Sequence, residues 1–193
     1  MAVMHISDSP PEFSVPVVVV GAGACGLTAA LAARDQGVDV LVVERDASPI
    51  GTTGMSTGLI PAAGTPEQRD RGIEDSPAQF ARDILQKAGQ GADAKIVRHL
   101  ASESSETVAW LMNQHAIELS LLDGFVYPGH SVMRMYGTPH RTGRELMAAL
   151  QAAASTAGVD ILTQAQVCDI LVRDDGEVAG IVVERPDGAR ETI

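Results

Sequence analysis

The feature that most constrains the fold is a glycine-rich turn that directly follows a run of four valines. Val17–Val20 is an unbroken apolar run, which is typical of a buried parallel strand. It leads into GAGACG, residues 21–26, in which three glycines have the spacing G-x-G-x-x-G. Gly21 permits a sharp strand-to-helix turn, Gly23 lets the backbone approach a pyrophosphate, and Gly26 allows the helix to pack closely on the strand. We therefore predict a βα turn that binds a dinucleotide.

The residues after this turn agree with a dinucleotide site. Small side chains at Ala29, Ala30 and Ala33 suit a closely packed helix, and Gly37 suits its end. A helix N-terminus carries about half a positive charge and unpaired N–H groups, which favour phosphate. The next apolar strand ends at Glu44, where a carboxylate accepts hydrogen bonds from an adenosine ribose. A glycine-rich turn without a ligand would not require all of these features together. The predicted cofactor-binding residues here are Gly21, Ala22, Gly23, Ala24, Cys25, Gly26, Glu44 and Arg45.

Composition narrows the class of protein. The chain has 193 residues, enough for a domain with its own core, and a formal net charge of −11. This charge argues against nucleic acid or an anionic membrane surface as a partner. No apolar run is long enough to cross a bilayer, so membrane insertion is not expected. An acidic, soluble enzyme is the interpretation that these numbers favour.

The N-terminal residues and the cysteines bear on location. Residues 1–14 contain acids and prolines but no basic segment followed by an apolar core. We predict a flexible leader there, not a signal peptide. Cys25 and Cys168 do not suggest a disulfide framework and fit a reducing cytoplasm. Neither cysteine is assigned a catalytic role.

Periodicity and capping residues divide the rest of the chain into elements. The first helix is expected over residues 25–36 and the second strand over 38–44. A segment rich in Gly, Ser, Thr and Pro follows at 46–68 without helical or strand periodicity, and loops of this length are usually functional. Three helices come next, over 76–88, from Asp93 onward, and from Thr142 to Gly158.

The C-terminal part changes character. Runs rich in Val and Ile are separated by the tight turns DDG at 174–176 and PDG at 186–188. The predicted strands are 159–163, 165–173, 177–185 and 189–193. We interpret them as an antiparallel meander attached to a parallel core. The predicted fold class is therefore α/β, a Rossmann-like FAD/NAD(P)-binding domain with a parallel sheet, helices and a meander.

Two features favour a flavin over a nicotinamide. A nicotinamide domain continues from its second strand through a helix to a third parallel strand. This chain instead enters the loop at 46–68, and no third parallel strand is evident soon after residue 65. Glu44 argues against NADP, because its charge would repel a 2′-phosphate. A nicotinamide-binding dehydrogenase stays as an alternative at this point.

Three further segments carry a resemblance to a known family. GTTGMSTG at 51–58 resembles the G-G-T-T-x-x-S-G-G loop of the FAD-dependent oxidoreductase 2 family. That family includes fumarate reductase and succinate dehydrogenase flavoproteins, 3-ketosteroid dehydrogenases and L-aspartate oxidases. GHS at 129–131 and TGREL at 142–146 are similar to its G-H-S…R…T-G-x-x-L stretch, and GEVAGI at 176–181 resembles its D-G-x-V-x-G-V segment. The resemblance covers residues 15–193 in the expected order.

By this resemblance the chain binds FAD, and the loop at 51–58 lies along the pyrophosphate and the flavin ring. Glycines and small hydroxyl residues let a backbone approach a planar ring without steric cost. Ile50 and Thr57 stand where the family has glycine, so the backbone is expected to differ there. Some relatives attach the flavin through a histidine in this loop, but this chain has none between His5 and His99, which implies noncovalent FAD. The matching cofactor-binding positions are Gly51, Thr52, Thr53, Ser56, Thr57, Gly58 and, in the meander, Val167.

The resemblance also implies an activity. The family's enzymes interconvert saturated and α,β-unsaturated substrates, so we expect a small-molecule carboxylate or ketone as substrate. Residues 15–193 would be the N-terminal FAD-binding domain, truncated before the capping domain and the closing FAD segment. The catalytic residues are unknown, and the missing C-terminal half or an electron-transfer partner would complete the enzyme. The alternatives are a noncatalytic FAD-binding fragment and a portion of a 3-ketosteroid dehydrogenase-like enzyme.

A second group of polar residues has two interpretations. His130, Arg134, His140 and Arg141 lie close together in the sequence. Arginine binds carboxylates in a bidentate manner, so these residues could lie near the flavin or a carboxylate substrate. Alternatively, they form a polar surface loop whose charges stabilise the fold. Their spacing does not match a zinc site, and no metal is predicted.

Overall fold

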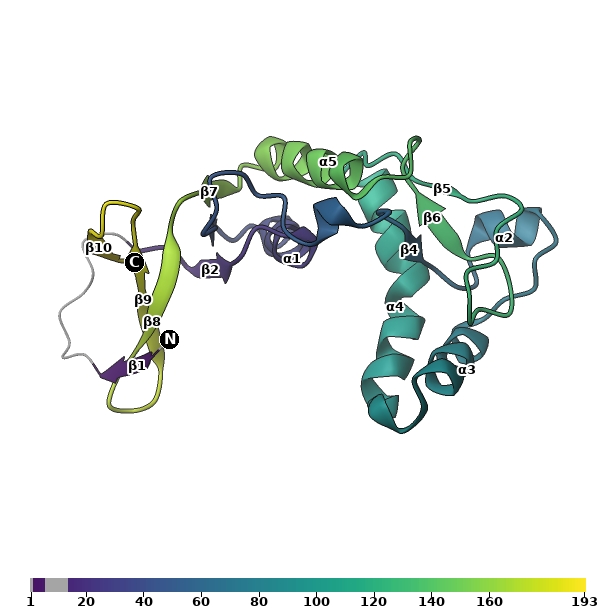
Figure 1. The fold of residues 1–193 in the computed structure, drawn as a ribbon, viewed down its shortest axis with the longest axis horizontal. Coiled ribbons are helices and arrows are strands. Elements are labelled where there is room, and N and C mark those ends of the chain that lie inside the picture. Colours follow the sequence, from purple (N-terminus) through teal and green to yellow (C-terminus); the bar gives the residue numbers. More distant parts are fainter. Residues whose placement is uncertain (1, 6–13) are drawn as a thin grey trace. The chain divides into compact units, whose positions relative to one another are not determined.

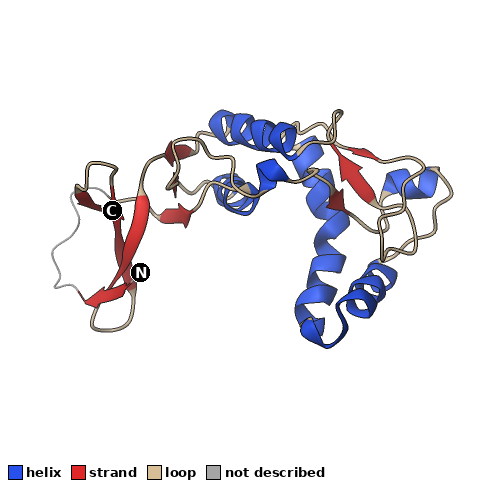
Figure 2. Cartoon of the chain, in the orientation of Figure 1, coloured by secondary structure: helices blue, strands red, loops and turns tan. Residues whose placement is uncertain are grey.

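The computed structural model describes residues 2–5 and 14–193. It divides into two compact units (Figure 1). Unit 1 comprises Met1–Thr53 and Leu150–Ile193, and unit 2 comprises Gly54–Ala149. Unit 2 is therefore inserted into the sequence of unit 1. Figure 2 shows that the described part contains both helices and strands, as an α/β protein requires.

Unit 1 contains a parallel sheet with the strand order β2-β3-β7. β2 (Val17–Val20) pairs with β3 (Val40–Val43), and β3 pairs with β7 (Asp160–Leu162). Helix α1 (Ala24–Asp35) connects the first two strands. All four residues of β3 are buried because strands flank it on both sides. β2, which was expected to be buried, is only half-buried, and Val20 is 60% exposed.

β7 corrects one prediction about the C-terminal part. Residues 159–163 were expected to begin the meander, but β7 is the third parallel strand of the core. Helix α5 (Gly143–Thr156) leads into it, as the crossover to a parallel strand requires. A short apolar run does not reveal whether its partner is parallel or antiparallel, so the sequence alone misplaced it.

The second sheet of unit 1 is the meander, with the strand order β1-β8-β9-β10. β8 (Gln166–Val172), β9 (Val178–Glu184) and β10 (Arg190–Thr192) are antiparallel, as predicted. β1 (Ala2–His5) adds to β8 in a parallel arrangement. These four residues are a strand and not part of a loose leader, because the open edge of β8 offers unpaired backbone groups. Residues 6–13 of the predicted leader lie outside the described residues.

The core of unit 1 joins both of its sheets. Buried side chains from β3, β9 and the chain end form one cluster, with partly buried side chains from β2 and β8 packed against it. Its buried members are Leu41, Val43, Ala165, Ile181, Val183 and Ile193.

Unit 2 is mainly helical. α3 (Pro77–Ala88) and α4 (Ala94–Asn113) pack against each other through a core that includes Phe80, Val97 and Ala101. The predicted N-caps are confirmed, since Ser76, Asp93 and Thr142 each accept a hydrogen bond from a backbone N–H of the first turn.

The region predicted as open coil at 46–68 is partly ordered. It contains a 3-10 turn η1 (Thr53–Met55), strand β4 (Ile60–Pro61) and the start of helix α2 (Pro66–Asp70). β4 pairs with β6 (Met135–Gly137), which also pairs with β5 (Ser120–Leu121). Two-residue strands carry no periodicity, so their prediction was not possible. A second 3-10 turn, η2 (Gly89–Gly91), follows α3.

Helix α2 did leave a signal in the sequence. Thr65 accepts a hydrogen bond from the N–H of Gln68, and the Gln68 side chain accepts one from the N–H of Thr65. This capping box, followed by Pro66 at the first helical position, predicts a helix start.

Candidate functional site

The backbone of the glycine-rich turn in unit 1 requires glycine at two positions. Gly21 has a φ of +97°, and its N–H donates to the carbonyl of Val43 at 2.7 Å. A Cβ added to Gly26 would lie 1.8 Å from the carbonyl oxygen of Gly21, which no side chain tolerates. The strand-to-helix turn that the sequence predicts is therefore formed.

The turn leaves room and donors for an anion. Gly23 has no atom within 4 Å of an added Cβ, so the space beside it is open. Within the described part of the chain, the backbone N–H groups of Gly23, Cys25 and Gly26 make no hydrogen bond, whereas the N–H of Leu27 closes the first helical turn onto the carbonyl of Gly23. Unpaired N–H groups at a positive helix end suit a pyrophosphate. This turn therefore fits the phosphate groups of a dinucleotide.

Glu44 lies directly beside the turn. Its Oε2 accepts a hydrogen bond from the N–H of Ala22 at 2.8 Å, and its Oε1 accepts one from the N–H of Asp46 at 2.9 Å. A carboxylate has about four lone-pair positions, so both oxygens have room for further donors. Arg45 is exposed and pairs with Asp46 at 3.3 Å. Glu44 is thus fixed beside the glycine turn, and its contact with a ribose stays a prediction.

Residues 51–58, which we call the flavin loop, begin in unit 1. An added Cβ on Gly51 would lie 3.7 Å from the Cα of Gly23, and the hydroxyl of Thr53 accepts the N–H of Ala24 at 3.4 Å. Thr52 is exposed. The first half of the flavin loop therefore lies against the glycine turn, as a shared ligand would require.

The second half of the flavin loop belongs to unit 2. Ser56 and Thr57 are exposed, and Met55 is 79% exposed. Gly58 is buried with a φ of +65°, and its N–H donates to Oγ of Ser56 at 3.0 Å. Thr57 replaces a glycine of the family, and its exposed position accommodates the side chain.

Val167 lies in β8, opposite Val183, at a β-bulge that separates it from Asp169. Its side chain packs against the core cluster of unit 1. The contact of its backbone with adenine stays a prediction.

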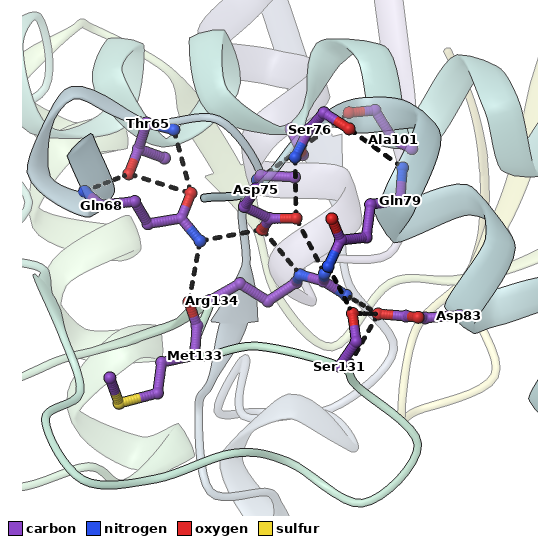
Figure 3. Close-up of polar contacts among 12 residues, drawn as sticks. Thr65, Gln68, Asp75, Ser76, Gln79, Asp83, Ala101, Ser131, Met133 and Arg134 are labelled. Carbon is purple, nitrogen blue, oxygen red and sulfur yellow. Dashed lines mark hydrogen bonds and ion pairs between the residues drawn. The ribbon is translucent and has the colours of Figure 1, made fainter. Parts of the chain in front are cut away.

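Arg134 is part of an internal ion-pair cluster in unit 2 (Figure 3). Its guanidinium is fully buried and binds Asp75 through Nε and NH2, both at 2.9 Å. NH1 donates to Asp83 at 2.6 Å, and the guanidinium lies 4.8 Å from the centre of the Phe80 ring. Because these donors are bound inside unit 2, Arg134 stabilises the fold and does not bind substrate.

Neighbouring side chains complete this Arg134 cluster. Asp83 accepts hydrogen bonds from the N–H and the hydroxyl of Ser131, and Gln68 donates to Asp75 and to the carbonyl of Met133 (Figure 3). Burial acts to raise the pKa of Asp83, but the hydrogen bonds from Ser131 and Arg134 hold the pKa below its ordinary value. Neither aspartate was predicted from the sequence, and only the need of a buried arginine for carboxylates could have indicated them.

The other three residues of the polar group identified in the sequence are His130, His140 and Arg141, and each has its own surroundings in unit 2. His130 lies between the rings of Phe80 and Tyr127, and burial, followed by the charge of Arg134, lowers its pKa. His140 is exposed and pairs with Glu145 at 2.8 Å, which raises the pKa of the histidine. Arg141 is exposed, with a φ of +55°.

The described residues contain no group of three or more His, Cys, Asp or Glu side chains placed to hold a metal ion. Among the same residues, every helix is too short or too polar to cross a membrane.

Comparison with known proteins places this geometry in a family. The sequence matches the family described as FAD binding domain over residues 16–193. It is 33% identical over 176 residues to the probable fumarate reductase Ifc3 of Shewanella frigidimarina, covering 90% of this chain and 29% of that protein. It is 28% identical over 205 residues to a 3-oxo-5-alpha-steroid 4-dehydrogenase of Comamonas testosteroni, covering 91% of this chain and 38% of that protein.

Solved structures give the same result. The open conformation of a flavocytochrome c3 fumarate reductase superposes with a TM-score of 0.86 at 31% identity, over 95% of this chain and 32% of that chain. A 3-ketosteroid-delta4-(5alpha)-dehydrogenase from Rhodococcus jostii RHA1 gives 0.82 at 25% identity, over 96% of this chain and 45% of that chain. The chain thus spans less than half the length of these relatives. From the family match, which agrees with the glycine turn and Glu44, we conclude that the chain belongs to the FAD binding domain family and that its cofactor is FAD.

Proposed function

We propose that this chain is the FAD-binding portion of an oxidoreductase that interconverts saturated and α,β-unsaturated substrates. The observation that supports it most directly is the glycine turn, whose unpaired N–H groups lie beside the Glu44 carboxylate. The names of the relatives, fumarate reductases and a steroid dehydrogenase, support the reaction class.

In this proposal the cofactor is bound noncovalently. Residues 21–26 bind the pyrophosphate, Glu44 accepts the ribose hydroxyls, and Arg45 lies at the rim of this site. The backbone of Val167 contacts adenine. The exposed hydroxyls and backbone of the flavin loop hold the flavin and the adjoining phosphates. The flavin-loop residues proposed to contact FAD are Gly51, Thr52, Thr53, Ser56, Thr57 and Gly58.

The flavin supplies hydride transfer, while binding and orientation of the cofactor come from this chain. A carboxylate or ketone beside the double bond would activate the substrate for this reaction. Arg134 is bound internally and is therefore not available as a proton donor. We therefore propose that polypeptide corresponding to the remainder of the relatives, or an electron-transfer partner, completes the active site.

FAD binding is the first test. Titration of the purified chain with FAD should quench flavin fluorescence at saturation, and NAD should not compete. Glu44→Gln should weaken FAD binding by about tenfold, because it removes the charge that accepts the ribose donors. Asp39→Asn, an exposed change outside the turn, serves as the control. A folded chain that binds NAD in preference to FAD would refute the cofactor assignment.

A noncatalytic FAD-binding fragment is the second candidate, and the internal use of Arg134 is the observation that favours it. The two candidates differ in the reaction that the FAD-loaded chain supports. Reduction of fumarate or of a 3-ketosteroid by a reduced dye, after addition of a polypeptide that carries the remainder of a relative, supports the enzyme. FAD binding without turnover in that assay supports the fragment.

We also propose a reducing compartment, the cytoplasm. Cys25 and Cys168, the cysteines of the chain, are both free thiols. Recovery of the protein in an oxidised, periplasmic fraction would contradict this location.

A further inference from the structure

We propose that Thr142 and Gly143, at the start of α5, are positioning residues that hold the second half of the flavin loop in its binding conformation before FAD arrives. The purpose assigned to this contact rests on the proposed function. The contact itself lies wholly within unit 2. Neither residue is among the proposed FAD contacts.

The two segments meet backbone to backbone. The N–H of Gly143 donates to the carbonyl of Ser56 at 2.9 Å. A Cβ added to Gly58 would lie 2.7 Å from the carbonyl oxygen of Thr142 and 3.0 Å from the nitrogen of Gly143. Backbone atoms cannot rotate aside as a flexible side chain would. The flavin loop therefore lies on the first turn of α5 at a distance that only glycine permits at position 58.

The first turn of α5 is itself fixed. Oγ1 of Thr142 accepts the N–H of Glu145 at 3.2 Å, and its carbonyl accepts the N–H of Leu146 at 3.1 Å. The Glu145 carboxylate in turn accepts the N–H of His140 at 2.9 Å. A capped helix end is a rigid support. The flavin loop is therefore held against an element whose geometry is set independently of the cofactor.

The opposite side of the flavin loop faces solvent. Gly58 is buried, whereas Ser56 and Thr57 are exposed. The hydroxyl of Ser56 also accepts the N–H of Gly58, which closes the loop on itself. A loop ordered before binding loses less conformational entropy when the ligand binds. The first turn of α5 therefore favours FAD binding without touching FAD.

A matched pair of alanine variants tests the contact without FAD. Gly58 and Gly72 have φ values of +65° and +67°, so alanine introduces the same backbone strain at both positions. An added Cβ at Gly72 meets no atom within 4 Å. We expect hydrogen exchange of the apo chain to show faster exchange at residues 56–59 in Gly58→Ala, with Gly72→Ala unchanged in that segment.

A second pair of variants tests the hydrogen bond between Gly143 and Ser56. Gly143 is the first residue of α5, a position where proline suits the helix, as Pro66 and Pro77 do in α2 and α3. Gly143→Pro deletes the N–H that binds Ser56. Ala94→Pro, at the first position of α4, is the control. Faster exchange at residues 56–59 is expected in Gly143→Pro and not in Ala94→Pro.

The same variants test whether the contact between the flavin loop and α5 increases FAD affinity. Gly58→Ala and Gly143→Pro should bind FAD about tenfold more weakly than their controls. The positioning role is refuted if Gly58→Ala and Gly143→Pro match their controls both in hydrogen exchange and in FAD affinity. That result would leave FAD binding by the wild type untouched. If the wild type binds no FAD but the exchange differences appear, the proposed function fails and the preformed contact stands.

Discussion

At the scale of single residues, the glycines of the first turn are required for different reasons. Gly26 has no space for a side chain, because the carbonyl of Gly21 lies 1.8 Å from the position of its Cβ. Gly23 has an ordinary φ of −74° and open space around it. Gly26 is therefore required by the fold, whereas Gly23 leaves space for a ligand.

Alanine substitutions separate these two roles. Gly26→Ala should lower the free energy of unfolding by about 1–3 kcal/mol or more, because the helix must move away from the strand. Gly23→Ala should leave the free energy of unfolding unchanged and weaken FAD binding by about tenfold. Urea denaturation and flavin fluorescence measure the two quantities. Equal FAD affinity in Gly23→Ala and wild type would contradict the predicted pyrophosphate position.

Cys25 reports on occupancy of the same turn. It is exposed within α1, next to the unpaired N–H groups. We expect a thiol reagent to modify Cys25 in the apo chain, and saturating FAD to slow this modification strongly. In the variant Cys25→Ser, Cys168 is the remaining cysteine, so its own labelling with and without FAD can be measured and subtracted. Labelling of Cys25 at one rate with and without FAD would place the phosphates elsewhere.

His130 predicts a dependence of stability on pH. Burial and Arg134 lower its pKa, so the unfolded chain binds the proton more tightly than the folded chain does. The contribution of neutral His130 to folding stability is complete above the ordinary histidine pKa of about 6.5. It is lost as the pH falls from there toward the pKa of His130 in the folded chain. His130→Phe should reduce the loss of thermal stability between neutral and mildly acidic pH. The exposed His99→Gln should leave it unchanged, and an equal loss in wild type and His130→Phe would exclude this histidine as the cause.

At the scale of elements, the Arg134 cluster connects α3 with the segment that leads into β6. Asp83 lies in α3, Asp75 lies just before α3, and Arg134 lies just before β6. A buried ion pair is costly when one partner is removed, because the remaining charges stay buried. We therefore expect the cluster to specify how these segments pair.

Removal of Arg134 should consequently cause a large loss of folding stability. Arg134→Met leaves Asp75 and Asp83 without their counter-charge and should destabilise the chain by about 3–5 kcal/mol. Arg98→Met, an exposed change on α4, should be nearly neutral. In Arg134→Met combined with Asp75→Asn, part of the loss should be recovered, which chemical denaturation would measure. A loss in Arg134→Met no greater than in Arg98→Met would contradict the structural role of the cluster.

The sequence predicted elements whose ends carry local signals. The caps at Ser76, Asp93 and Thr142 gave α3, α4 and α5, and the glycine turn gave α1 with its two strands. A capping box would direct the side chains of Gln79 and Glu145 back to Ser76 and Thr142. Instead, Gln79 donates to Ser131 and Glu145 accepts from His140. Contacts between residues distant in sequence are absent from a local pattern. Such contacts determine these tertiary partners, the two-residue strands and the carboxylates around Arg134.

At the scale of the whole molecule, charge should influence cofactor binding. The chain has a net charge of −11, and the pyrophosphate of FAD is also negative. Raising the ionic strength shortens the Debye length from about 30 Å at 0.01 M to about 8 Å at 0.15 M, which screens the long-range repulsion. FAD affinity should therefore increase over this range. Riboflavin, which lacks phosphate, should show no such dependence, and a decrease for FAD would mean that the positive end of α1 outweighs the net charge.

The insertion of unit 2 into the sequence of unit 1 has a consequence for how the chain acquires its structure. The valine strand and the glycine turn leave the ribosome early, but β7 and the meander strands follow only after all of unit 2. Loop closure over so long a separation is slow, and chains fold from the N-terminus as they are synthesised. Unit 2 is thus expected to reach its native state first. The nucleotide turn is synthesised before unit 2, but the parallel sheet that carries it is complete only when β7 has been added after unit 2.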